Sequence, residues 1–288
     1  MQIHEISGSG GLRLHVREWG RADAPAILFI HGWSQCHLCW KMQYESALAD
    51  EFRLVALDCR GHGMSEAPLE AEHYADSRLW ADDVAAVVDQ LGLGRPVLVG
   101  WSYGGYIVCD YLRIHGPAGI AGVNLAGGAV VLGQAAFGTL IGPGFLDHIH
   151  GAIADDLPTN IQAMRSFVRA CTARPLPQEE IEAVLCWNMV VPAKVRAALA
   201  RRELDNDDVL RSLSVPVLVT HGRADTVVLP AMAERILACC PTASASWYDG
   251  VGHAPFIEDA DRFNAELAAF VRRAVPSEAA AADKAAER

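Results

Sequence analysis

The clearest indication of chemistry in this 288-residue sequence is a serine set among glycines. The stretch "VGWSYGGYIV" (99–108) holds Ser102 within the pattern G-x-S-x-G, which runs from Gly100 to Gly104. An apolar run typical of a buried strand precedes the pattern, and a helical pattern follows it. A turn of this kind strains the backbone and presents the serine hydroxyl, while the flanking glycines avoid steric clashes. We therefore predict that Ser102 is a nucleophile at the N-terminus of a helix, whose dipole favours developing negative charge.

A serine hydroxyl is inert at neutral pH and needs a general base, which in turn needs a carboxylate to orient it. His253 lies in "YDGVGHAPFIE", a glycine-containing loop late in the chain, and is the predicted base. Asp225, in "VLVTHGRADTVV", directly follows a buried-strand pattern and is the predicted acid. The order Ser102, Asp225, His253 is the nucleophile–acid–base order that accompanies this turn. Asp249 is an alternative acid, but its closeness to His253 in the sequence favours a turn-forming role.

An acyl-transfer reaction also needs N–H donors for the oxyanion. The segment "FIHGWSQ" follows a strand pattern, so the backbone N–H of Trp33 is one predicted donor. The N–H of Tyr103, the residue after the nucleophile, is the other. His31 is predicted to be structural, with its ring hydrogen-bonded to nearby backbone.

Two further polar segments are interpreted as structural. Cys36 and Cys39 form a C-x-x-C near His31 and His37, but no second ligand pair has metal-site spacing, so we predict no metal and no cofactor. The turn "LDCRGHGMSEAP" is expected to hydrogen-bond a tight loop beside the nucleophile rather than to react. Its polar side chains are Asp58, Arg60, His62 and Ser65.

The elements that must position these residues alternate between strand-like runs and helical patterns, which is typical of a mostly parallel sheet covered on both faces. The strand-like runs are 12–19, 26–30, 53–57, 96–101, 120–125, 215–221 and 243–248, and the first of them alternates like an antiparallel strand. From about residue 126 to 212 the patterns are helical, with no convincing strand. We therefore expect a core of residues 1–125 and 213–275, a helical cap of residues 126–212, and a disordered tail of residues 276–288, which holds no large apolar side chain.

Composition limits the range of partners. The net charge of −11 argues against nucleic acid, because phosphate binding needs a basic surface. The segment "MQIHEISGSG" lacks a signal-peptide pattern, no apolar run is long enough to span a bilayer, and the eight cysteines have no disulfide-framework spacing. We predict a cytoplasmic protein with a small-molecule partner and no membrane partner; a homo-oligomer is compatible with the sequence.

In these residues and their order, the chain resembles the α/β-hydrolase superfamily over about residues 10–125 and 213–273. The segments "HGW", "DCRGHGMS", "GWSYGG", "HGRAD" and "GVGHAPF" occur in the family's order. Within the superfamily the chain looks most like the small serine esterases and the cofactor-free haloperoxidase (perhydrolase) group. The resemblance implies an eight-stranded, mainly parallel sheet with a helical cap after the sixth strand, and a triad of Ser102, Asp225 and His253. The serine at the turn separates the chain from related dehalogenases and epoxide hydrolases, which use aspartate there.

The expected reaction is hydrolysis of a small, largely apolar carboxylic ester through an acyl-serine. Perhydrolysis, lactone opening and C–C bond hydrolysis use the same triad and stay open as alternatives, as does a non-catalytic ligand receptor on this fold. Aromatic and sulfur-containing cap residues, Phe167 among them, suggest an apolar acyl or alcohol pocket. The residues predicted to line it are Trp33, Phe137, Phe145, Trp187 and Met189.

Overall fold

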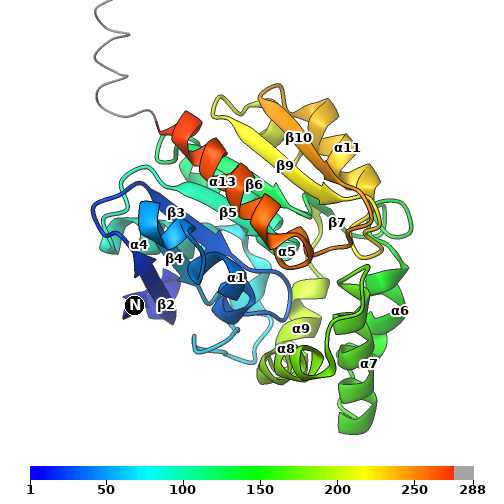
Figure 1. The fold of residues 1–288 in the computed structure, drawn as a ribbon. Coiled ribbons are helices and arrows are strands. Elements are labelled where there is room, and N and C mark those ends of the chain that lie inside the picture. Colours follow the sequence, from blue (N-terminus) through cyan, green and yellow to red (C-terminus); the bar gives the residue numbers. More distant parts are fainter. Residues whose placement is uncertain (276–288) are drawn as a thin grey trace, which may run out of the picture.

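The computed structural model describes residues 1–275, which form one large sheet covered by helices (Figure 1). The prediction made for residues 276–288 lies outside the described residues. The sheet has eight strands in the order β1-β2-β4-β3-β5-β6-β9-β10. Their bounds are β1 (Gln2–Ser7), β2 (Arg13–Gly20), β3 (Ala26–Ile30), β4 (Arg53–Leu57), β5 (Val97–Trp101), β6 (Gly122–Ala126), β9 (Val217–Gly222) and β10 (Ala243–Tyr248).

The direction of the strands confirms the predicted mostly parallel sheet. β2 pairs antiparallel with β1 and β4, as its alternating pattern predicts, and the six strands from β4 to β10 pair in parallel. β1 is absent from the strands that the patterns predicted. Its burial follows no clear alternation, and only pairing with β2 defines it.

The apolar runs form strands because both faces of the sheet are buried. Alternate residues of β3 point to opposite faces: Leu28 and Ile30 belong to one hydrophobic cluster, Ile27 and Phe29 to the other. On the first face lie α4 (Ser77–Gln90), α5 (Tyr103–His115) and α11 (Pro230–Cys239). On the second face lie η2 (His37–Trp40), α2 (Leu48–Glu51) and α13 (Ala260–Ala274).

The segment between β6 and β9 is mainly helical, as expected. It holds α6 (Pro143–Ala152), α7 (Leu157–Ala170), α8 (Gln178–Val190), α9 (Ala193–Ala200) and α10 (Asp207–Arg211). Figure 1 shows α6 to α9 gathered on one side of the sheet, and we call these four the cap helices. The segment also contains two short strands that the patterns did not predict, β7 (Val131–Leu132) and β8 (Leu204–Asp205), which pair antiparallel.

The other short elements are η1 (Ser9–Gly11), α1 (Lys41–Tyr44), α3 (Glu72–Ala75) and α12 (Pro255–Glu258). Across residues 1–275, no helix taken singly combines the length and the apolar composition of a membrane span. The consecutive helices α8 and α9 reach that length and composition only when taken together, and they are bent by 82°.

Candidate active site

Ser102 lies at the sharp turn between β5 and α5. Its φ of 53° and ψ of −116° fall in a region that non-glycine residues rarely adopt. Such a conformation costs about 1–3 kcal/mol and persists where surrounding contacts hold it. The carbonyl of Ser102 accepts hydrogen bonds from the N–H groups of Gly105 (2.9 Å) and Ala129 (3.0 Å), which fix the turn. The predicted strained serine turn is therefore present.

Two glycines allow the backbone to pack closely around this turn. A Cβ at Gly104 would lie 2.3 Å from the carbonyl oxygen of Ile30, at the end of β3. A Cβ at Gly32, in the loop after β3, would lie 3.0 Å from the Cβ of Ser102. The glycines thus bring the β3 loop (residues 31–36) against the serine.

His253 and Asp225 form a buried pair. The Nδ1 of His253 lies 2.7 Å from the Oδ2 of Asp225, and both side chains are almost fully inaccessible to solvent. The other carboxylate oxygen of Asp225 accepts hydrogen bonds from the N–H groups of Val227 (2.8 Å) and Val228 (3.0 Å). An ionised carboxylate only accepts, so Nδ1 carries a proton and donates it. The Nε2 of His253 is buried and has no hydrogen-bond partner among residues 1–275.

The backbone of His253 is anchored beside the serine turn. Its carbonyl accepts a hydrogen bond from the indole Nε1 of Trp101, the residue before Ser102, at 2.9 Å. The rings of Trp101 and His253 lie 5.6 Å apart. The backbone N–H of His253 donates to the carbonyl of Cys171 at 3.0 Å. The ring is thus held by contacts from β5 and from the loop that follows α7.

The alternative acid has different surroundings. The side chain of Asp249 is 90% exposed and lies 3.1 Å from the Nε of Arg223. It makes no hydrogen bond to His253. Geometry therefore favours Asp225 over Asp249 as the partner of His253.

The β3 loop has a second strained residue, Ser34, with a φ of 61°. Its N–H donates to the Nε2 of His62 (3.2 Å), and its hydroxyl donates to the carbonyl of Asn188 in α8 (3.0 Å). These bonds fix the adjacent Trp33. Within residues 1–275, the backbone N–H groups of Trp33 and Tyr103 have no hydrogen-bond acceptor, so both remain available to a ligand.

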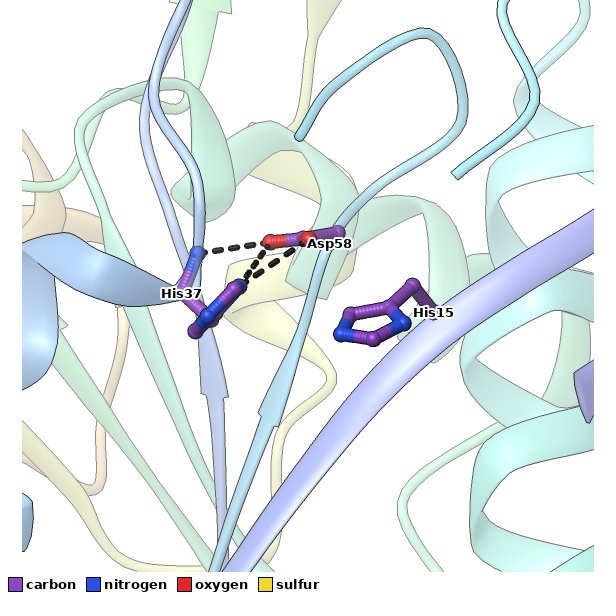
Figure 2. Close-up of side chains that lie close together, drawn as sticks. All are labelled: His15, His37 and Asp58. Carbon is purple, nitrogen blue, oxygen red and sulfur yellow. Dashed lines mark hydrogen bonds and ion pairs between the residues drawn. The ribbon is translucent and has the colours of Figure 1, made fainter. Parts of the chain in front are cut away.

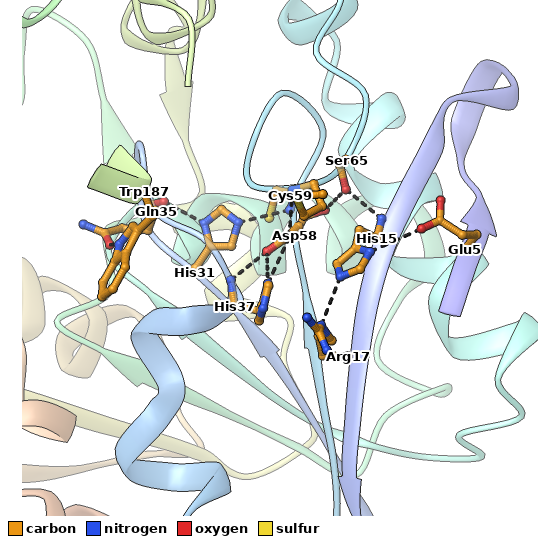
Figure 3. Close-up of polar contacts among 12 residues, drawn as sticks. Glu5, His15, Arg17, His31, Gln35, His37, Asp58, Cys59, Ser65 and Trp187 are labelled. Atoms are coloured by element: carbon orange, nitrogen blue, oxygen red, sulfur yellow. Dashed lines mark hydrogen bonds and ion pairs between the residues drawn. The ribbon is translucent and has the colours of Figure 1, made fainter. Parts of the chain in front are cut away.

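The turn that follows β4 is a network of hydrogen bonds around Asp58 (Figure 3). The carboxylate of Asp58 accepts from the backbone N–H of His37 (2.6 Å), from its ring Nδ1 (2.9 Å) and from the N–H of Met64 (3.0 Å). Burial is the largest single influence on Asp58 and opposes its charge, but the interactions with His37, His31 and the N–H of Met64 together outweigh it and lower the pKa of Asp58. His31 accepts a hydrogen bond from the N–H of Cys59 at 3.0 Å. These hydrogen bonds confirm that the ring of His31 bonds to nearby backbone and that Asp58 holds a tight loop together.

One group of side chains in the described region, His15, His37 and Asp58, has metal-ligand atoms within 4.8 Å of one another (Figure 2). The hydrogen bonds do not fit a metal. The ring of His15 uses both nitrogens, with Nδ1 3.2 Å from Glu5 and Nε2 accepting from the Nε of Arg17 at 3.2 Å. The positive charge of Arg17 would also repel a cation. These side chains join loops and strands instead.

The C-x-x-C thiols are equally poor ligands. Cys36 and Cys39 are buried and free, and burial raises the pKa of each thiol. A protonated thiol is neither a metal ligand nor a nucleophile. The interpretation of these cysteines as small buried side chains agrees with their surroundings.

Ser102 opens onto an apolar cavity of about 30 Å³ between the sheet and the cap helices. Trp33, Phe145 and Phe167 form one wall of aromatic rings. Trp33 meets each of the other two edge-on, with ring centroids 5.3 Å apart. No charged side chain lines the cavity. The full lining is Trp33, Ser102, Tyr103, Tyr106, Ala129, Leu132, Ile141, Phe145, Phe167, Ala200, Val227 and Val228.

Three of the predicted pocket residues are not among this lining. Phe137 forms a β-bridge with Ile141, and Met189 packs against the hydrophobic core. Trp187 donates its Nε1 to the Oε1 of Gln35 (2.8 Å) and lines a separate surface cavity. The structure thus places these three outside the cavity at Ser102, because the types of apolar residue in a cap helix do not indicate which side faces the serine. Val227 and Val228 were missed, although their position directly after Asp225 was an available signal.

Comparison with known proteins identifies the family of the chain. The Alpha/beta hydrolase family model matches residues 27–266, and the chain belongs to this family. It is 30% identical to a bifunctional esterase/perhydrolase from Acinetobacter calcoaceticus, over 93% of this chain and 99% of the relative. It is 29% identical to a non-heme haloperoxidase from Rhodococcus erythropolis, over 92% and 98%. The crystal structure of an esterase from Rhodococcus sp. ECU1013 superimposes with a TM-score of 0.88 at 36% identity, over 94% of this chain and 98% of that chain. The predicted family and fold are confirmed.

Proposed function

We propose that this protein is a serine hydrolase that cleaves a small, largely apolar carboxylic ester through an acyl-serine. The observation that carries the proposal is the state of His253. One ring nitrogen is held by Asp225, while the other is buried and unbonded beside a strained serine turn. A neutral imidazole in this state has a lone pair available as a general base.

In the proposed first step, the Oγ of Ser102 attacks the acyl carbonyl carbon and His253 takes the hydroxyl proton on Nε2. Asp225 stabilises the imidazolium that forms and keeps the other ring proton on Nδ1. The oxyanion accepts hydrogen bonds from the N–H groups of Trp33 and Tyr103. Loss of one such donor in other enzymes costs about 2.7–4 kcal/mol of transition-state stabilisation.

In the second step, the tetrahedral intermediate collapses and the alcohol leaves with the proton from His253. His253 then takes a proton from a water molecule, whose oxygen attacks the acyl-serine. The bond to Oγ breaks, the carboxylic acid is released, and Oγ takes the proton back from His253. The volume of the apolar cavity at Ser102, about 30 Å³, is close to that of one water molecule, so we expect the cavity to widen when it takes the acyl or alcohol group. Its lining favours groups without charge at the reacting end.

Perhydrolysis is the second candidate, because the two relatives above are named an esterase/perhydrolase and a haloperoxidase. Hydrogen peroxide would then replace water in the attack on the acyl-serine and release a peroxyacid. The test is a panel of short-chain esters assayed with and without hydrogen peroxide, with the S102A variant as control. Ester turnover that depends on Ser102 supports the proposal. Binding of esters without turnover of any of them favours a receptor.

A further inference from the structure

Arg196, in the cap helix α9, is a buried cation without a counter-charge. Only 2% of its surface is exposed, and no carboxylate of residues 1–275 lies within ion-pair distance. Its Nη2 donates to the Oδ1 of Asn160 at 2.8 Å. Its Nε and Nη1, which together carry three N–H groups, have no partner among the described residues. Burying a charge in this way is unfavourable unless another group pairs with it.

The other two deeply buried arginines of the described region are paired. Arg60 lies 2.7 Å from Asp83, and Arg202 lies 2.7 Å from Asp110. Burial opposes the charge of Arg202, but Tyr103 and Asp110 outweigh it and raise its pKa. The fold therefore supplies a carboxylate to a buried arginine elsewhere and supplies none to Arg196.

The surroundings of Arg196 are otherwise uncharged. Burial lowers its pKa to about 10, so the guanidinium stays protonated at neutral pH, and no neighbouring charge contributes to that shift. The nearby His62 is neutral, because burial lowers its pKa to about 3. A single cation in apolar surroundings matches a single negative charge and not a dianion.

Arg196 adjoins the cavity at Ser102. Ala200, which lines that cavity, lies one helical turn further along the same face of α9. The carbonyl of Arg196 accepts a hydrogen bond from the Nε1 of Trp33 at 3.2 Å. Asn160 and Phe167, seven residues apart, share a face of α7. The contacts of Arg196 are therefore with residues beside the cavity, and its own side chain is not part of the lining.

We propose that Arg196 binds a carboxylate. The carboxylate is carried by the ester substrate, at the end remote from the cleaved bond, or by a free acid such as the product. The N–H groups of Nε and Nη1 would donate to it, and its charge would compensate the guanidinium. The substrate form of this inference rests on the proposed ester hydrolysis, whereas the free-acid form does not.

The first experiment compares esters of matched length on the full-length protein. The half-methyl esters of succinate, glutarate and adipate carry a remote carboxylate; methyl butanoate, pentanoate and hexanoate do not. In Arg196→Met, the ratio of kcat/KM for charged over neutral ester is expected to fall by at least about 10-fold, as for loss of a buried charge partner. Arg196→Lys should retain part of the ratio. Arg201→Met, at an exposed position, removes the same charge from the cap and should leave the ratio unchanged.

The second experiment needs no turnover. Sodium propionate should raise the unfolding temperature of the wild type above that in an equal concentration of sodium chloride, and this difference should vanish in Arg196→Met.

The two experiments together identify the source of the carboxylate. A changed ester ratio indicates a carboxylate on the substrate. A propionate effect with an unchanged ratio indicates a free acid. If neither readout distinguishes Arg196→Met from Arg201→Met, the proposal is overturned. If no ester is cleaved, the proposed function fails, and the propionate experiment still tests Arg196. If Arg196→Met does not fold, the test compares the wild type with Arg196→Lys. The proposal is then overturned if neither protein shows a propionate effect or a preference for charged esters.

Discussion

The Nδ1 of His253 lies 2.7 Å from the Oδ2 of Asp225, while the opposite nitrogen of the same ring is buried without a partner among residues 1–275. This arrangement fixes the tautomer that a general base needs, because the ring proton is held on the side facing the carboxylate. Asp225 is in turn held by the N–H groups of Val227 and Val228, which also line the cavity. The acid and part of the pocket therefore share one short loop.

The first prediction concerns Asp225. Asp225→Asn is expected to lower kcat by about 10⁴, because the amide no longer enforces the productive tautomer of His253. Steady-state kinetics on a short-chain ester measure the effect. Asp249→Asn is the matched control and should leave kcat within a factor of two or so, since Asp249 is exposed and pairs with Arg223. The reverse result would transfer the acid role to Asp249.

The second prediction concerns the aromatic wall of the cavity. Phe145→Ala should shift the preferred acyl or alcohol group towards longer chains, because it removes one ring from the lining. A misfit of one methylene in such a pocket changes kcat/KM by roughly 10-fold or more. A chain-length profile of p-nitrophenyl esters measures the shift. Trp187→Ala, which alters an equally half-buried cap residue outside the lining, should keep the wild-type profile. Equal shifts in both variants would argue against this cavity as the substrate pocket.

The third prediction is a pH dependence of stability around Asp58. Its lowered pKa means that the folded state favours the carboxylate, so its contribution is present above the ordinary pKa of 3.8 and is lost as the pH falls through the lower folded value. Asp58→Asn should lower the free energy of unfolding at pH 7 by about 1.5–3 kcal/mol. Urea unfolding at pH 7 and pH 3 should show that the difference from wild type shrinks at pH 3. A difference that is equal or larger at pH 3 would contradict the lowered pKa.

The fourth prediction contrasts two buried arginines. Arg202→Met leaves Asp110 buried and unpaired, so the free energy of unfolding should fall by about 3–5 kcal/mol. Arg196→Met removes a charge that no carboxylate of the described region pairs with, so it should be far less destabilising. Chemical unfolding of both variants in a buffer free of carboxylates makes the comparison. Equal losses would show that Arg196 has a structural partner of comparable strength.

Much of the candidate site could be predicted from the sequence because its residues stand at the ends of strands within short motifs. Ser102, Asp225 and His253 each follow or adjoin an apolar strand pattern, and the carboxyl ends of parallel strands meet at one edge of the sheet. The structural role of His31 followed from the same local context, and its ring does bond to nearby backbone.

The cap was less predictable because its contacts join distant parts of the chain. Trp187 pairs with Gln35, and Asn188 accepts a hydrogen bond from Ser34, so the orientation of α8 depends on a loop far away in the sequence. Arg196 is the strongest case. An arginine in a helical pattern is expected at the surface, but Arg196 is buried and hydrogen-bonds to Asn160 of α7 and, through its carbonyl, to Trp33.

The most direct test of Ser102 as the nucleophile is covalent labelling. The wild type is incubated with a fluorophosphonate probe and digested, and the adduct is located by mass spectrometry, with ester turnover followed in parallel. If Ser102 is the nucleophile, one adduct forms on Ser102 as activity disappears, and S102A loses about 10⁶ in kcat with its fold unchanged. Ester turnover at near-normal rates in S102A, or inactivation by an adduct on another residue, would contradict it.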